Sequence, residues 1–430
     1  MLYQKSQSLY PARETGWWLL GILLFSMLPE GLAISIAGRT PTVTFLDVLL
    51  PVVSLYILAR NCLGPPYFGF ADKKIFLLGW GILFVNLLSL LGNLRDIPRG
   101  VFALKVFAFG LIIYWILLAT ISTERGLERA ASILVVWGGV LGLLLAYQFF
   151  SDWSSVFGPV ASYDAKQEIG LSMGKSNYLA AILVPILPVG LALSVSRKGS
   201  QRTGLLLAAG AMSLGLLITM SKGALLSLIL GSLVSAPLLL KAGLKLKHLF
   251  LILIAMGLSA AVLPRDLLLA NYDMFAYRID NPDVGRLQLW ILSWKVFLQN
   301  PLLGVGPGAI YLYNQRIGID ELYSHNSLLN MFSELGLAGG FPFLLLLGNF
   351  LRRSYRLCTS TISQGSRKYL PLGFFIGLVS TLLHGMVEPT FQGQQYTVVF
   401  WAIVALVHLH GEALLKYSAP GQTVLTLGSA

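Results

Sequence analysis

Apolar runs long enough to cross a lipid bilayer recur along nearly the whole chain, and no other feature constrains its fold as strongly. A run of roughly 18 or more apolar residues is typical of a transmembrane helix. The composition agrees, since 56% of the 430 residues are hydrophobic and only 12% are charged. Soluble domains carry about 25% charged residues. The sequence therefore predicts an all-α polytopic membrane protein that forms a single integral membrane domain over residues 1–430.

Twelve transmembrane helices are predicted from these runs, and the basic residues orient them. Lys and Arg gather in the short cytoplasmic loops of membrane proteins. Most of the Lys and Arg residues lie on the cytoplasmic side if both termini are cytoplasmic. The predicted spans are residues 17–36, 42–62, 75–94, 101–121, 130–150, 177–195, 204–220, 223–240, 247–264, 325–350, 369–389 and 395–415.

The formal net charge of +12 has the same explanation, so it does not indicate a nucleic-acid partner. The two cysteines, Cys62 and Cys358, fall near predicted cytoplasmic loops. Disulfides are rare in that compartment. We therefore expect no structural disulfide.

One predicted outside segment, residues 265–324 between spans 9 and 10, is too long to be a simple connection. Loops of this length usually have a function. Its stretch LQLWILSWKVFLQN repeats apolar residues at the spacing of one helix face. The tryptophans suit a membrane interface. These apolar positions are Leu287, Trp290, Ile291, Trp294, Phe297 and Leu298.

Several cations lie on the outer side, where the sidedness rule does not place them. Arg278 and Arg286 are in the long loop, and Lys175 and Lys222 are next to outer span ends. An anionic ligand such as a phosphate would account for the group. The alternative is that each cation pairs with an acidic residue, since six Asp and Glu side chains share the same loop: Asp266, Asp273, Asp280, Asp283, Asp320 and Glu321.

Polar residues cluster at the start of the tenth predicted span, in SHNSLLNMFSELGLAGG. His325 is expected at the outer start of this span, with Ser324 as its N-cap, and can act as a base near neutral pH. The alternative is a histidine that only lies at the interface. Asn326, with Asn330 and Ser333, forms a polar stripe that should face the bundle. Glu334 is half a turn away from His325, so we expect it to form a structural contact instead of orienting His325.

Two further motifs carry less information. His384 and Glu388 in HGMVEP are four residues apart, which is suitable for metal ligands, but two groups do not complete a zinc site. GVGPG at 304–308 follows a predicted helix, not a strand, so it reads as a tight turn and not as a dinucleotide-binding motif.

Four segments together resemble the superfamily of O-antigen ligases and O-antigen polymerases, which are bacterial glycosyltransferases that use lipid-linked oligosaccharides. The most specific are GRLQLWILSWKVFLQNPLLGVGPG (285–308) and the His-Asn and Glu-x-Gly elements of SHNSLLNMFSELGLAGG (324–340). GKSNYLAAILVPILP (174–188) and ITMSKGALLSLILG (218–231) resemble upstream family segments in the same order.

The resemblance implies about twelve spans in the bacterial inner membrane and a periplasmic loop that closes over a cavity. It implies inverting transfer of a glycan from undecaprenyl pyrophosphate to an acceptor hydroxyl, without metal, cofactor or nucleotide sugar. His325 would be the catalytic base, and Arg286 would bind the donor pyrophosphate. Lys222 stands where the family usually has arginine, so it keeps the charge but loses the bidentate fork. Lys175 and Arg278 are further expected phosphate partners from the sequence alone.

Several functions share these features. We expect an O-antigen ligase that transfers the glycan to lipid A–core at the periplasmic face. A polymerase that joins two lipid-linked glycans is the close alternative, and a protein O-oligosaccharyltransferase is a third. A transporter with a cationic cavity is a different class. Transporters usually place charges near the bilayer midplane and contain repeated halves. Here the cations of the outer side cluster outside the bilayer, and the sequence contains no evident repeat.

Overall fold

The computed structural model describes residues 16–27, 34–35, 42–43, 45–63, 73–92, 94–151, 176–243, 286–319, 322–361 and 368–417. The regular secondary structure in this part of the chain is helical apart from one antiparallel pairing of two-residue strands, in which Ile34 is opposite Val43. The elements are α1 (Gly16–Phe25), β1 (Ile34–Ser35), β2 (Thr42–Val43), α2 (Phe45–Leu63), α3 (Lys73–Gly92), η3 (Leu94–Asp96), α4 (Ile97–Thr120), α5 (Glu124–Ser151), α8 (Ser176–Ser196), α9 (Gly199–Ile218), α10 (Lys222–Val234), α11 (Ala236–Lys241), α14 (Arg286–Gln299), α15 (Ile310–Arg316), α16 (Ser327–Thr361), α17 (Tyr369–Gly385), η6 (Thr390–Gln392) and α18 (Gln394–Tyr417).

Within the described residues, six helices are long and apolar enough to cross a membrane, and four shorter helices are also apolar. Large apolar side chains such as Leu77 and Leu207 are exposed on the outside of the bundle. The protein is therefore a polytopic membrane protein. The number of twelve spans stays a prediction, and the predicted span 247–264 lies outside the described residues.

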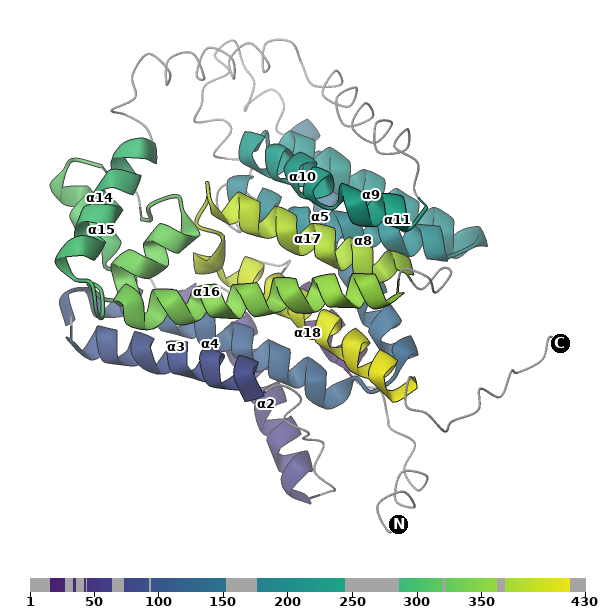
Figure 1. Cartoon of the computed structure of the whole chain (residues 1–430), viewed down its shortest axis with the longest axis horizontal. Coiled ribbons are helices and arrows are strands. Elements are labelled where there is room, and N and C mark those ends of the chain that lie inside the picture. The colour runs from purple at the N-terminus through teal and green to yellow at the C-terminus, as the bar shows by residue number, and fades with distance from the viewer. Residues whose placement is uncertain are drawn as a thin grey trace.

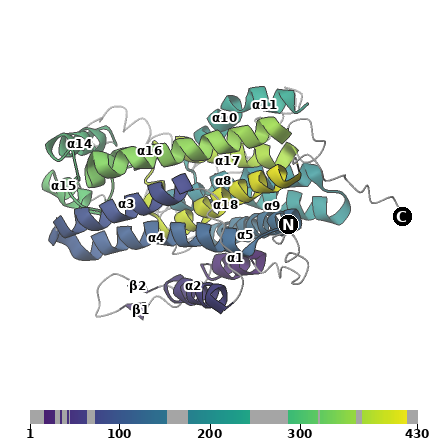
Figure 2. The same cartoon turned by 60° about the horizontal axis from the view of Figure 1, so that its bottom comes forward.

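Helix α18 forms the centre of the bundle. Every residue from 398 to 407 is buried, so this helix is apolar on all sides, as expected for a helix that other helices surround. It packs against α4, α5, α8 and α16, and Figure 2 shows it between α16 and α4. The ring of Trp401 meets the edges of Phe107 and Phe350 from two of these helices.

Two predicted spans are wrong in their extent. The span predicted at 17–36 is a helix only to Phe25, and Ile34 and Ser35 belong to a strand. Pro29 and Gly31 follow the helix in the sequence, and both residue types disfavour its continuation. The span predicted at 223–240 divides into α10 and α11, because Pro237 occupies the first turn of a new helix.

Helix α16 is interrupted at Gly336, whose φ of 61° and ψ of −159° are not helical. The freed backbone groups bond to the turn at 301–306: Leu337 N–H donates to the Pro301 carbonyl at 2.7 Å, and Gly306 N–H donates to the Glu334 carbonyl at 3.0 Å. A Cβ at Gly336 would overlap the Leu302 carbonyl, so only glycine fits. The glycine-rich turn and the Glu-x-Gly motif are thus two halves of one backbone joint.

This joint fixes α14 and α15 at one end of the bundle, beside the start of α16 (Figure 1). The predicted amphipathic helix is present as α14, but its apolar positions divide between two faces. Phe297 is buried and contacts the Phe332 ring of α16. The exposed positions form a stripe in which successive residues are about one turn apart: Leu287, Ile291, Trp294 and Leu298. The periplasmic location of residues 265–324 stays a prediction, and 265–285 lie outside the described residues.

Candidate functional site

The carboxylate of Glu388 is the centre of the candidate site. It lies in the connection between α17 and η6, and only 4% of the residue is exposed. Its Oε1 accepts hydrogen bonds from the Arg286 guanidinium and, at 2.6 Å, from the Asn177 amide. Its Oε2 lies 3.0 Å from His325 Nδ1. Three elements that are distant in the sequence therefore meet at one buried anion.

His325 lies in the loop before α16, with the unusual φ of 52° for a residue that is not glycine. A carboxylate can only accept hydrogen bonds, so Nδ1 is the donor to Glu388. In the neutral imidazole the proton is then on Nδ1, and Nε2 is the nitrogen that can accept a proton. The side chain is 18% exposed, which keeps it accessible to a substrate.

The loop of His325 is held by its polar neighbours. Asn326, not Ser324 as predicted, is the N-cap of α16: its Oδ1 accepts from Leu328 N–H at 3.0 Å and from Leu329 N–H at 3.1 Å. The Ser324 hydroxyl instead bonds to the Asn330 side chain and the Asn326 carbonyl. The predicted polar stripe thus shapes the loop that carries His325.

The loop of Glu388 is attached to the same helix start. Ser327, the first residue of α16, donates its hydroxyl to the Glu388 carbonyl at 3.0 Å and accepts from Thr390 N–H at 3.0 Å. These bonds join the backbone that follows His325 to the backbone at and after Glu388. The contact between the two side chains is therefore part of a connected polar network.

The first residues of four helices gather around Glu388. Asn177 in α8, Arg286 in α14 and Ser327 in α16 bond to it directly. At the start of α10, Gly223 lies against Val387 and the His384 ring, so Lys222 begins a helix at the same corner. Helix N-termini carry partial positive charge and favour anions. The corner is therefore electropositive except for Glu388.

The charges around Glu388 determine its protonation. Burial alone would raise the pKa of this carboxyl, but the hydrogen bond from His325 and the positive charge of Arg286 outweigh burial. The pKa of Glu388 is consequently below its ordinary value, and the group is ionised at neutral pH.

The other predicted site residues have different positions. Glu334 is buried and interacts with the backbone of Gly308 and Ile310 and with the Asn330 side chain. Glu334 thus contacts the glycine-rich turn, whereas Glu388 contacts His325, and the predicted structural role of Glu334 stays a prediction. Lys175 and Arg278 lie outside the described residues.

Sequence reasoning missed the role of Glu388 and of Asn177. HGMVEP was considered only as a weak pair of metal ligands. Among the described residues, no three His, Cys, Asp or Glu side chains gather as a metal site. His384 is fully buried, and neither of its ring nitrogens has a hydrogen-bond partner in the described part of the chain. The available signal was the position of Glu388, an acidic residue at the predicted outer end of an apolar span.

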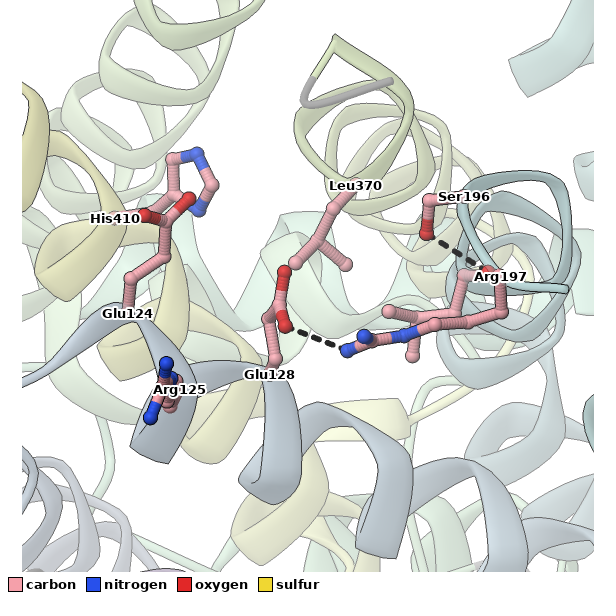
Figure 3. Close-up of a pocket in the computed structure, with 8 residues that line it drawn as sticks. Glu124, Arg125, Glu128, Ser196, Arg197, Leu370 and His410 are labelled. Carbon is pink, nitrogen blue, oxygen red and sulfur yellow. Dashed lines mark hydrogen bonds and ion pairs between the residues drawn. The ribbon is translucent and has the colours of Figure 1, made fainter. Parts of the chain in front are cut away.

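A separate pocket of about 310 Å³ lies at the other ends of α8, α17 and α18, with Glu128 and Arg197 among its lining residues. These two side chains form an ion pair across it, as Figure 3 shows. Both groups are about one-third exposed. The Glu128–Arg197 ion pair is remote from Glu388 and can serve as a control for substitutions of Glu388.

Part of the chain, including several residues of the candidate site, matches a known protein family. Residues 207–344 match the model of the O-antigen ligase family. This confirms the resemblance inferred from the motifs, and the family points to a glycosyltransferase-like ligase or polymerase of lipid-linked glycans in the membrane. Lys222, Arg286 and His325 lie within the matched region, whereas Asn177 and Glu388 lie outside it. A search of curated proteins finds no match.

Proposed function

We propose that this chain, whose residues 207–344 match the O-antigen ligase family model, is an O-antigen ligase. The observation that supports this proposal is that His325 and Arg286 both contact one buried carboxylate, that of Glu388. The proposed reaction transfers a glycan from undecaprenyl pyrophosphate to a hydroxyl of lipid A–core.

In this reaction the donor pyrophosphate binds at the electropositive corner. Arg286 offers several N–H donors in a plane, which match phosphate oxygens, and its side chain is 34% exposed. Lys222 begins α10 at the same corner, and Lys175 and Arg278 are the further proposed contacts. Cations here stabilise the negative charge that develops on the leaving pyrophosphate.

His325 Nε2 is the proposed general base. It accepts the proton of the acceptor hydroxyl as that oxygen attacks the anomeric carbon. The new bond joins the acceptor oxygen to the anomeric carbon, and the bond from that carbon to the phosphate oxygen breaks with its electron pair. Undecaprenyl pyrophosphate leaves, and the proton on His325 passes to solvent. Attack opposite the leaving group inverts the anomeric centre.

The proposed setting is the bacterial inner membrane, with both termini in the cytoplasm and the site at the periplasmic face. In this route, cationic side chains and a histidine catalyse the transfer. We therefore propose that the reaction needs no metal or nucleotide sugar. Chelation by EDTA should then leave the rate unchanged.

The test is transfer by the purified protein in detergent, with an undecaprenyl-pyrophosphate glycan and lipid A–core in the presence of EDTA. A single shifted lipid A–core band, absent with His325→Ala and Arg286→Ala, is the expected result. A ladder of longer glycans that forms without lipid A–core would assign the protein as a polymerase. Transfer to neither acceptor, with several donors, would overturn the proposal.

A further inference from the structure

Glu388 joins the two proposed functions of the site through its two oxygens. Oε2 contacts the base His325, while Oε1 contacts Arg286, the proposed donor-binding residue. The carboxylate is almost completely buried, but the Arg286 side chain is 34% exposed. A phosphate can therefore contact the exposed side of the Arg286 guanidinium while the buried Glu388 carboxylate still bonds to the other side of the guanidinium.

We propose that Glu388 is a positioning residue that holds His325 in the tautomer with its proton on Nδ1 and competes with the donor pyrophosphate for Arg286. This inference rests on the proposed function and assigns a role to a residue outside the matched family region. Binding of the donor pyrophosphate would then increase the basicity of His325.

The first half of the proposal follows from the hydrogen bond. A carboxylate that accepts from Nδ1–H fixes the tautomer and orientation of an imidazole and makes its other nitrogen more basic. The bonds of Ser327 join the backbone that follows His325 to the backbone at and after Glu388, so the two side chains cannot easily separate. The left-handed backbone of His325 is compatible with a side chain that is held for function.

The second half follows from charge. When a pyrophosphate attracts Arg286, less positive charge compensates Oε1, and the two anions repel each other. The negative charge of Glu388 then acts more strongly on His325, so the imidazole becomes a better base when the donor is bound. The groups that face this exchange are Arg286 from α14, His384 from α17, Asn177 from α8 and Lys222 at the start of α10.

The test uses Glu388→Gln in the full-length protein and does not need glycan transfer. The chain has five histidines, so ¹⁵N-histidine NMR can follow the ring nitrogens, with His325→Gln as the assignment variant. In the wild type, His325 should carry its proton on Nδ1. In Glu388→Gln its pKa should fall by about one unit, because an opposite charge is lost. Inorganic pyrophosphate should bind the variant up to about tenfold more tightly, because the competing carboxylate is removed.

Two control variants separate this role from a structural one. Glu388→Asp retains the charge and should recover part of the His325 pKa, which tests the proposal if Glu388→Gln unfolds. Glu128→Gln removes a carboxylate from the Glu128–Arg197 ion pair at the other end of α8 and should change neither measurement. An unchanged pKa and tautomer of His325 in a folded Glu388→Gln protein would overturn the proposal, as would weaker pyrophosphate binding. The transfer assay can fail independently, and that result would reject the proposed function alone.

Discussion

Arg286 is the residue at which charge and geometry can be separated. It bonds to Glu388 from within and is partly exposed to a ligand from outside. Arg286→Lys keeps the positive charge but has one nitrogen in place of a planar fork. We expect kcat/KM for the donor to fall roughly 10–100-fold, equivalent to about 1.4–2.8 kcal/mol of transition-state stabilisation. Steady-state kinetics with varied donor would measure this. A lysine variant with wild-type kcat/KM would show that a bidentate contact is not needed.

Substitutions of Asn177, which bonds to the Glu388 carboxylate, would change the electrostatic environment of that carboxylate. Its amide donates to Oε1 at 2.6 Å. Asn177→Ala removes one hydrogen bond to a charged group, and such a bond contributes about 1.5–3 kcal/mol to the stability of the folded protein. Asn177→Asp also sets a second carboxylate against Glu388, which raises the pKa of Glu388 and opposes its ionised form. Transfer should therefore be slower in Asn177→Asp than in Asn177→Ala at pH 7. The reverse order of the two rates would contradict this description of the site.

At the scale of elements, the interruption of α16 positions the site more than any single helix does. Gly336→Ala would place a Cβ against the Leu302 carbonyl at a positive φ. Such backbone strain costs of order 1–3 kcal/mol, so the variant should unfold at a lower temperature and transfer glycan more slowly. Gly348→Ala is the matched control, because it lies in the same helix with open space around it. Thermal unfolding in detergent would compare the two. Equal melting temperatures would mean that the joint tolerates a side chain.

An ion pair also connects two helices, α2 and α4. Lys105 lies within a predicted span, and its Nζ is 2.9 Å from Asp47 Oδ1. Removal of one partner leaves a charge in an apolar environment, whereas removal of both leaves none. Lys105→Met and Asp47→Asn should each lower the melting temperature, and the double variant should recover most of the loss. Additive losses would show that the two groups do not interact.

The apolar runs predicted α3, α4 and α8 to within a few residues, although α8 contains Pro185 and Pro188. They could not predict the break at Gly336, because that break exists only to accept the backbone of 301–306. Residue types and motifs singled out Arg286 and His325. Glu388 was missed because its partners are 63 and 102 residues away in the chain. Local spacing paired it with His384 instead, and only the folded bundle brings it to His325.

At the scale of the whole molecule, the orientation in the membrane is a prediction from charge alone. Gln315 in α15 and Arg202 in α9 are both exposed and belong to predicted opposite sides. In a chain with Cys62 and Cys358 replaced, Gln315→Cys should react with a membrane-impermeant maleimide added to spheroplasts. Arg202→Cys should react only after permeabilisation. The opposite pattern would place the site in the cytoplasm and contradict the proposed acceptor.

The central claim is that the corner formed by His325, Arg286 and Glu388 transfers a glycan from a lipid pyrophosphate. The most direct measurement is the release of undecaprenyl pyrophosphate from a radiolabelled donor by purified protein, with and without acceptor, beside His325→Ala and Glu128→Gln. We predict release that depends on the acceptor, at least a hundredfold slower in His325→Ala, as removal of a general base costs about 10²–10⁴-fold, and unchanged in Glu128→Gln. Equal release by wild type and His325→Ala would contradict the account.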